Sequence, residues 1–214
     1  YPLLLNYPYF DLYRKQVVKQ ADLVMAMFIR GDAFTPEEKA RNFAYYDART
    51  VRDSSLSACV QAVMAAEVGH LELAHDYLGE AALMDLHDLH QNSRDGLHIA
   101  SLAGTWISLV AGLGGMRDFN GQLSFAPRLP SRINNMEFSL LWRGLRLRVN
   151  VTASEVTYSL RNGGGSARLT ILHHGKEVEV TQVRPVTMAI PPAPAVGPAP
   201  AQPAGRAPVR RATS

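Results

Sequence analysis

Apolar residues recur at helical spacing through the first half of this 214-residue chain. Within residues 10–30 they lie three or four positions apart, which predicts a helix, and Gly31 follows as a stop signal. The residues Thr-Pro-Glu-Glu at 35–38 supply an N-cap, a proline at the first helical position and acids in the first turn, so they predict another helix start. Three further helices are expected from the pattern, at residues 54–68, 71–89 and 98–112.

Beyond residue 117 the spacing changes to strand-like alternation. Between residues 138 and 151 apolar and polar side chains alternate, and Gly144 interrupts them as a turn. Further short strands are expected at residues 155–160, 169–172, 176–180 and 184–190. We therefore predict a fold of the class α followed by β, with helices in residues 1–117 and a small antiparallel β-sandwich in residues 118–190.

The last 24 residues differ in composition from the rest. Residues 191–214 hold seven of the 13 prolines, and such a Pro/Ala-rich segment cannot bury a core, so we expect it to be disordered. The formal net charge of +3 is accounted for by three arginines of this tail, Arg206, Arg210 and Arg211. The remainder carries no general basic field, and nucleic-acid binding is not expected.

One uncharged stretch is nearly long enough to span a membrane. Residues 99–116 form an uncharged run of 18 residues, but their glycines and hydroxyl side chains favour a buried core helix.

The single cysteine, Cys59, lies in an apolar helical pattern and is predicted to be a buried hydrophobe. Without a second cysteine there is no disulfide framework, which favours a cytoplasmic compartment. Because the chain opens on an apolar, proline-containing run, we expect it to be part of a longer protein.

A polar, hydroxyl-rich loop at residues 45–57 leads into the helix predicted at 54–68. At a helix N-terminus the unpaired N–H groups and the helix dipole both favour an anion. The residues alone leave two interpretations open: an ordinary N-cap made by Asp53 or Ser54, or an anion site. The polar candidates at helix boundaries are Lys19, Gln20, Asp47, Arg52, Asp53, Ser54, Ser55, Ser57 and His98.

These residue types suit a sugar bound beside an oxyanion. Lysine, amide and carboxylate groups hydrogen-bond hydroxyls in fixed directions, while hydroxyls, a cation and helix N–H groups bind phosphate. His87 and His90 lie at helical i, i+3 spacing but have no evident third ligand, so we expect no metal site.

Four motifs follow one another along the chain: Lys-Gln-Ala-Asp at 19–22, Asp-Ser-Ser-Leu-Ser at 53–57, Asp-Gly-Leu-His-Ile-Ala-Ser-Leu-Ala-Gly-Thr-Trp at 95–106 and Gly-Gly-Met-Arg-Asp at 114–118. In this order they make the chain resemble glycoside hydrolase family 65, which comprises trehalose, maltose and kojibiose phosphorylases and their hydrolytic relatives. The resemblance covers residues 1–190. It implies that residues 1–117 are the C-terminal part of a six-hairpin α/α-barrel catalytic domain and that residues 118–190 form a small jelly-roll-like domain.

The resemblance also implies roles for individual residues. The residues that match the family's sugar site are Lys19, Gln20 and Asp47, the last of which stands where the family usually has a glutamate. The residues that match its phosphate pocket are Arg52, Ser54, Ser55 and His98. Arg52 replaces a histidine that is usual before Asp-Ser-Ser, which puts phosphate geometry or substrate choice in doubt.

The activity implied is inverting phosphorolysis of an α-glucosyl disaccharide, giving β-glucose 1-phosphate and glucose, with inorganic phosphate as co-substrate and no cofactor. The family's general acid, a glutamate, has no matching motif in this chain, so we expect the 214 residues alone to be inactive. The alternatives are a hydrolase of the same family (trehalase-like or another α-glucosidase) and a non-catalytic carbohydrate-binding remnant. Expected partners are the disaccharide and phosphate but no membrane, and a homodimer is a candidate assembly of the longer parent protein.

Overall fold

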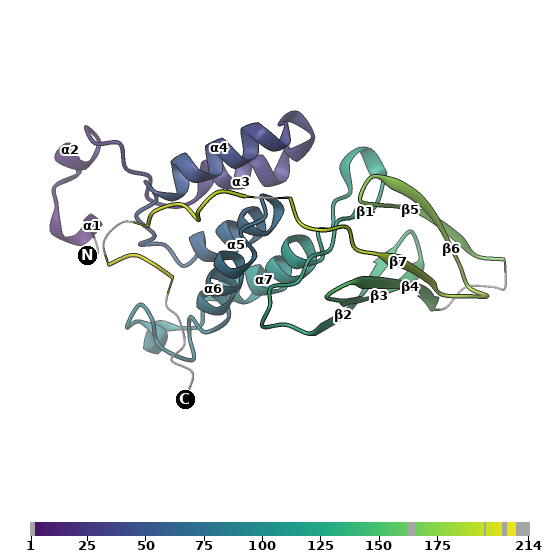
Figure 1. Cartoon of the computed structure of the whole chain (residues 1–214). Coiled ribbons are helices and arrows are strands. Elements are labelled where there is room, and N and C mark those ends of the chain that lie inside the picture. Colours follow the sequence, from purple (N-terminus) through teal and green to yellow (C-terminus); the bar gives the residue numbers. More distant parts are fainter. Residues whose placement is uncertain (1–2, 162–165, 195, 203–204, 209–214) are drawn as a thin grey trace. The chain divides into compact units, whose positions relative to one another are not determined.

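The chain divides into two compact units in the computed structural model, which describes residues 3–161, 166–194, 196–202 and 205–208 (Figure 1). Tyr1–Gly112 together with Ala195–Ser214 make up the helical unit, and Leu113–Pro194 make up the β unit. The prediction of helices followed by β-sheets is confirmed. The domain boundaries expected at residues 117 and 190 stay predictions.

Helix α5 (Ser57–Glu67) lies at the centre of the helical unit. Nine of its 11 residues are buried, since apolar side chains cover almost every side of the helix. It packs against four other helices, which are α3 (Asp22–Ile29), α4 (Pro36–Asp47), α6 (Leu71–Ala82) and α7 (Ile99–Ile107). Two helices of four residues precede them, α1 (Leu3–Asn6) and α2 (Tyr9–Leu12).

The start of α4 confirms the capping signal in the sequence, and a glycine follows the end of α5. Thr35 precedes α4 with a complete capping box: its Oγ1 accepts from the Glu38 backbone N at 3.2 Å, and Glu38 Oε2 accepts from the Thr35 backbone N at 2.9 Å. Gly69 follows α5 with a φ of +96°, a conformation that glycine adopts without steric strain.

The single helix predicted for residues 10–30 is wrong. Helices α2 and α3 are separate, and between them Val18 pairs with the segment that follows α4. The Val18 N donates to the Arg49 carbonyl oxygen at 2.9 Å, and the Val51 N donates to the Val18 carbonyl oxygen at 2.7 Å. Because another segment satisfies these backbone groups, tertiary pairing overrides the helical spacing of the side chains. The bridge holds residues 18–20 beside the loop between α4 and α5.

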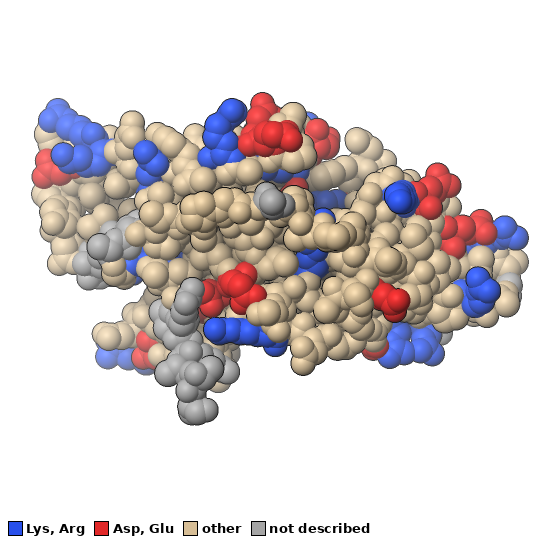
Figure 2. Space-filling view, viewed as in Figure 1, with Lys and Arg blue, Asp and Glu red and all other residues tan. Residues whose placement is uncertain are grey.

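The other predicted helices are shorter than expected. The pattern at 71–89 gives α6, which ends at Ala82, and the pattern at 98–112 gives α7 followed by a π-helical turn, Ser108–Leu113. Among the residues that the structure describes, no helix is long and apolar enough to span a membrane. On the face drawn in Figure 2, the described acidic and basic side chains are interspersed and do not gather into a basic patch.

The β unit consists of two sheets that face each other. In one, the order is β2 (Asn135–Trp142), β3 (Leu145–Thr152), β4 (Glu155–Arg161) and β7 (Val186–Ala189), all antiparallel; in the other, it is β1 (Ser124–Phe125), β5 (Arg168–His173) and β6 (Lys176–Thr181). The rings of Phe125 and Tyr158, one from each sheet, lie 5.5 Å apart. The expectation of a purely antiparallel sandwich is wrong in one respect, because β1 pairs in parallel with β5. That strand is only two residues long and leaves no periodic signal.

Candidate functional site

The loop between α4 and α5 carries most of the polar residues that the sequence singles out. It follows Asp47, the last residue of α4, and leads to Ser57, the first residue of α5. The Val18 bridge lays Gln20 along this loop, and Gln20 Oε1 accepts a hydrogen bond from Ser54 Oγ at 2.9 Å. A residue of the expected sugar set and a residue of the expected phosphate set are therefore in direct contact.

Asp47 is the most enclosed charged group of the site, with 0% of its surface exposed. Gln61 Nε2 donates to its Oδ1 at 2.7 Å, the Tyr77 hydroxyl lies 3.0 and 3.1 Å from its two oxygens, and Gln202 Nε2 donates to Oδ2. Burial raises the pKa of Asp47, although the donors and the charge of Arg52 act in the opposite direction. Converging donors fix the carboxylate, which makes it an acceptor of defined direction for a ligand hydroxyl.

Arg52 is buried in a left-handed backbone conformation, with a φ of +61°. Such a conformation is sterically costly for a residue with a Cβ atom. Its Nη2 forms an ion pair with Glu80 Oε2 of α6, and the guanidinium carbon lies 4.8 Å from the centre of the Tyr77 ring. Its Nε is buried and has no hydrogen-bond partner among the described residues. An anion at this point would therefore share Arg52 with Glu80.

The N-cap interpretation of the loop is wrong. Leu56 occupies the N-cap position of α5, and its side chain makes no capping bond. The Ser54 Oγ accepts from the backbone N of Leu56 at 3.3 Å, and Leu56 itself lies one position before the first residue of α5. The Asp53 carboxylate accepts from the Leu4 backbone N at 3.4 Å and forms an ion pair with Arg206 Nη2 at 3.2 Å. Neither Asp53 nor Ser54 caps the helix.

Three other candidates contribute less defined contacts. Lys19 is exposed, and Ser55 is half-buried. Ser57 is buried, and its Oγ has no hydrogen-bond partner among the described residues. Of the three, Ser57 offers an unused donor at the start of α5, whereas Lys19 is a cation in contact with solvent.

His98 lies at the N-cap position of α7 and is oriented by Asp85. The His98 backbone N donates to Asp85 Oδ2 at 2.9 Å, and its Nδ1 lies 2.5 Å from Asp85 Oδ1. The bond from the His98 side chain lowers the pKa of Asp85, so this carboxylate is ionised at neutral pH and Nδ1 is the donor. Nε2 is then the ring nitrogen left for a ligand. The ring centres of His98 and His90 lie 6.0 Å apart.

A hollow of about 100 Å³ lies beside Arg52. It has room for a small anion or a few water molecules, since one water occupies about 30 Å³ in the liquid. Burial, as the largest cause, lowers the pKa of His90, which lies at its edge. The residues that line it are Arg52, Glu80, Leu89, His90, Gly205, Arg206 and Ala207. The tail thus forms part of the wall.

Several residues of the site were not predicted from the sequence. Two weak signals could have found some of them: Gln61 is the polar residue in an apolar run at 58–66, and Tyr77 and Glu80 are three residues apart on one helix. Nothing in the composition of the tail indicated Gln202 or Arg206.

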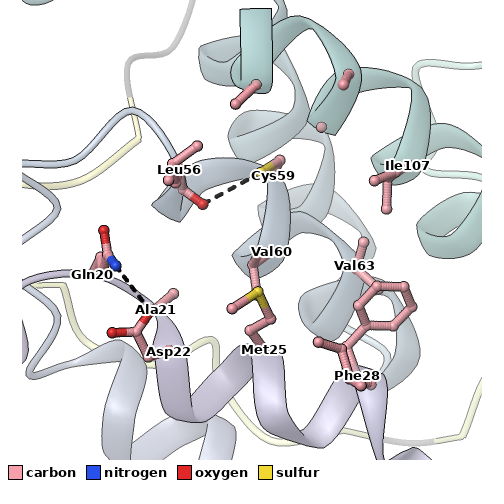
Figure 3. A pocket seen from close by; sticks show the side chains of 14 residues that line it. Gln20, Ala21, Asp22, Met25, Phe28, Leu56, Cys59, Val60, Val63 and Ile107 are labelled. Carbon is pink, nitrogen blue, oxygen red and sulfur yellow. Dashed lines mark hydrogen bonds between the residues drawn. The ribbon is translucent and has the colours of Figure 1, made fainter. Parts of the chain in front are cut away.

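A larger, apolar groove of about 390 Å³ lies between α3, α5 and α7 (Figure 3). Gln20 and Asp22 are the polar side chains at one end, next to Leu56 and Cys59. Burial raises the pKa of the Cys59 thiol, so it stays protonated and behaves as the small hydrophobe that was predicted. Gln20 therefore lies where the apolar groove meets the polar loop.

Two family models match the chain, and together they decide its classification. The central catalytic domain of glycosyl hydrolase family 65 matches residues 1–107, and the C-terminal domain of the same family matches residues 116–180. The chain belongs to glycoside hydrolase family 65. The family resemblance stated from the four motifs is confirmed.

The relatives agree with this classification. An uncharacterized glycosyl hydrolase of Mycobacterium leprae is 57% identical over 211 residues, which are 99% of this chain and 26% of that protein. The α,α-trehalose phosphorylase of Thermoanaerobacter brockii is 40% identical over 163 residues, 76% of this chain and 21% of that protein. A solved structure from the human microbiome, assigned as a kojibiose phosphorylase, is 27% identical with a TM-score of 0.83 over 91% of this chain and 28% of its own.

Two facts about length follow from these matches. The family 65 chain spans about a quarter of the length of the relatives that it matches. Since the mycobacterial match covers 99% of the chain, it includes nearly all of the Pro/Ala-rich tail.

Proposed function

We propose that this chain forms the C-terminal part of a disaccharide phosphorylase. Residues 1–107 would supply the last helices of an α/α barrel, with the loop between α4 and α5 facing the substrate. The reaction would be inverting phosphorolysis of an α-glucosyl disaccharide, giving β-glucose 1-phosphate and glucose. The names of the relatives, which include trehalose, maltose and kojibiose phosphorylases, support this class of reaction.

The observation that carries the proposal is the 2.9 Å hydrogen bond between Gln20 Oε1 and Ser54 Oγ. In an inverting phosphorolysis the phosphate attacks the anomeric carbon directly, so groups that bind the sugar and groups that bind the phosphate must be neighbours. With ligands bound, Ser54 would turn its one hydroxyl proton from Gln20 Oε1 to the phosphate, and Gln20 Oε1 would then accept from a hydroxyl of the glucosyl unit. Their contact supports a nucleophile site adjoining a sugar site.

Phosphate is favoured over an activated water as the nucleophile. A hydrolase of this geometry needs a carboxylate that is available to act as general base. Apart from the tail, Asp47 is held by Gln61 and Tyr77, and Asp53 accepts from the Leu4 backbone N. Arg52 keeps a buried Nε–H without an acceptor among the described residues. The loop therefore offers donors to an anion, while each of its two carboxylates is already engaged by groups outside the tail.

The first test concerns the reaction itself. The longer parent protein, given trehalose, maltose or kojibiose, is expected to release glucose 1-phosphate only when phosphate is present. Equal activity without phosphate would instead establish a hydrolase. The 214-residue chain alone is expected to release none, because no residue of it matches the family's general acid; release of glucose 1-phosphate by the chain alone would refute that expectation.

The second test separates the two halves of the site in the parent protein. Ser54→Ala is expected to raise the KM for phosphate about 10- to 100-fold, the range for a lost hydrogen bond to a charged group, with little change in the KM for the disaccharide. Asp47→Asn is expected to act mainly on the disaccharide. Ser139→Ala, on an exposed position of β2, serves as the control. Equal effects of Ser54→Ala on both substrates would contradict the assignment.

A further inference from the structure

The tail of the chain lies in the site that the preceding section assigns to ligands. Residues 196–202 and 205–208 form neither helix nor strand, yet they belong to the helical unit (Figure 1, yellow). Val196 packs against the glycine that ends α5: a Cβ atom on Gly69 would come within 2.7 Å of Val196 Cγ1. From there the tail reaches the loop between α4 and α5.

Gln202 occupies the hydrogen-bonding positions around Asp47. Its Nε2 donates to Asp47 Oδ2, and its Oε1 lies 2.8 Å from the Tyr77 hydroxyl, where it competes with Asp47 for the single hydroxyl proton. A primary amide carries a donor and an acceptor side by side, which is also what a pair of sugar hydroxyls presents. The amide therefore satisfies the same carboxylate and phenol that a glucosyl unit would use.

Arg206 closes over the other end of the site. Its Nε donates to the Val51 carbonyl oxygen at 2.7 Å, its Nη2 donates to the Arg52 carbonyl oxygen, and its guanidinium pairs with Asp53 at 3.2 Å. In return, Arg52 Nη1 donates to the Arg206 carbonyl oxygen. Four groups of the loop between α4 and α5 are thus engaged by one residue of the tail.

Charge favours this docking. The tail at 191–214 has three arginines and no acidic residue, whereas the site has three carboxylates, Asp47, Asp53 and Glu80, around one buried arginine. Gly205, with a φ of +72°, provides the turn that lets the chain present both Gln202 and Arg206 to the loop.

We propose that the tail segments 196–202 and 205–208 are an internal ligand of the candidate saccharide and phosphate site, and that substrate binds only when they leave. This inference rests on the proposed function. A site that is occupied by its own tail binds an external ligand with an affinity reduced by the fraction of molecules that are open. Release of the tail is expected to strengthen the binding of glucose and phosphate on the order of tenfold, which corresponds to a tail docked about nine-tenths of the time.

Trypsin cleavage after Arg206 measures docking without any assumption about function. In the 214-residue chain the docked Arg206 side chain is 22% exposed, so cleavage is expected to be at least about tenfold slower than in a synthetic peptide of residues 196–214. Gln202→Ala removes one anchor but leaves the cleavage site intact, and it is expected to accelerate cleavage. Arg184→Ala, on an exposed residue of the β unit, should not change the rate.

Competition is tested by adding glucose together with inorganic phosphate. Both are expected to accelerate cleavage of the chain but not of the peptide, and calorimetry is expected to show tighter binding to Gln202→Ala than to the wild type. Cleavage of the wild type as fast as the peptide overturns the docking. Ligand binding that leaves cleavage protected overturns the competition. Protection with no ligand binding by either form overturns the competition while the docking stands as measured, and the phosphate-dependence assay on the parent protein decides the proposed function separately.

Discussion

Removal of one hydroxyl group tests the buried network around Asp47. In Tyr77→Phe the ring keeps its place, 0% exposed and 4.8 Å from the Arg52 guanidinium, but Asp47 loses the donor that lies 3.0 and 3.1 Å from its oxygens. A hydrogen bond to a charged group contributes about 1.5–3 kcal/mol, so we expect the free energy of unfolding to fall by about 2 kcal/mol. With a urea dependence of about 2 kcal/mol per molar, the unfolding midpoint of the helical unit should fall by about 1 M.

Tyr158→Phe is the matched control. Tyr158 is equally buried, and its hydroxyl lies 3.0 Å from Nδ1 of His173, so the hydrogen bond that is lost involves no carboxylate and is expected to cost only about 1 kcal/mol. Far-UV circular dichroism follows the helical unit, and the fluorescence of Trp142 follows the β unit when Trp106 of α7 is replaced by phenylalanine in all variants. Equal costs for the two variants at neutral pH would refute an ionised Asp47 as the acceptor.

The pH dependence of the Tyr77→Phe effect gives a second check. Because burial raises the pKa of Asp47, the folded state holds this proton more tightly than the unfolded chain. Protonated Asp47 contributes most to stability below the pKa that it has in the unfolded chain. This contribution is lost as the pH rises through the higher pKa that Asp47 has in the folded state. In acid the acceptor is neutral, so the cost of Tyr77→Phe should approach that of the control.

Three further predictions concern other parts of the chain. Glu80→Gln removes the carboxylate paired with Arg52, whose side chain is 3% exposed, and is expected to lower the free energy of unfolding by about 3–5 kcal/mol. Glu137→Gln, in a pair whose two side chains are each 37% exposed, should leave the unfolding midpoint nearly unchanged. Burial lowers the pKa of His174 to about 4, so the β unit should lose stability as the pH falls from 6.5 towards 4, and His174→Gln should flatten this dependence in urea titrations. Gly115→Ala places a Cβ 2.4 Å from a backbone oxygen and should destabilise the β unit by more than about 2 kcal/mol; Gly175→Ala, which also has a positive φ but open space, should cost less.

The parts of the fold that follow from local patterns could be predicted from the sequence. The capping box at Thr35 and the alternation around Gly144 each depend on neighbouring residues, and both appear in the structure. The interruption of the helix at 10–30 depends on Val18 pairing with a segment about 30 residues away. Side-chain spacing carries no information about such a partner, so the helical pattern was misleading there.

The candidate site shows the same division. Polar residues next to helix ends were recognisable from composition, and the structure brings Gln20 and Ser54 into contact. The groups that hold Asp47, namely Gln61 and Tyr77, lie inside apolar patterns and look like core residues in the sequence. Their role appears only when three helices are assembled around one carboxylate.

The tail and a phosphate ion carry opposite charge, and this makes the two halves of the site unequal. When sugar hydroxyls replace the Gln202 amide around Asp47, one neutral group replaces another, so the net charge of this half of the site does not change. Replacing the Arg206 guanidinium by phosphate exchanges one positive charge for up to two negative ones, beside Asp53 and a Glu80 already paired with Arg52. Protonation of a carboxylate of the site would offset part of this repulsion, and the raised pKa of Asp47 favours proton uptake there. Because Asp47 lies in the sugar half, phosphate binding is expected to depend on pH through a group that also holds the sugar.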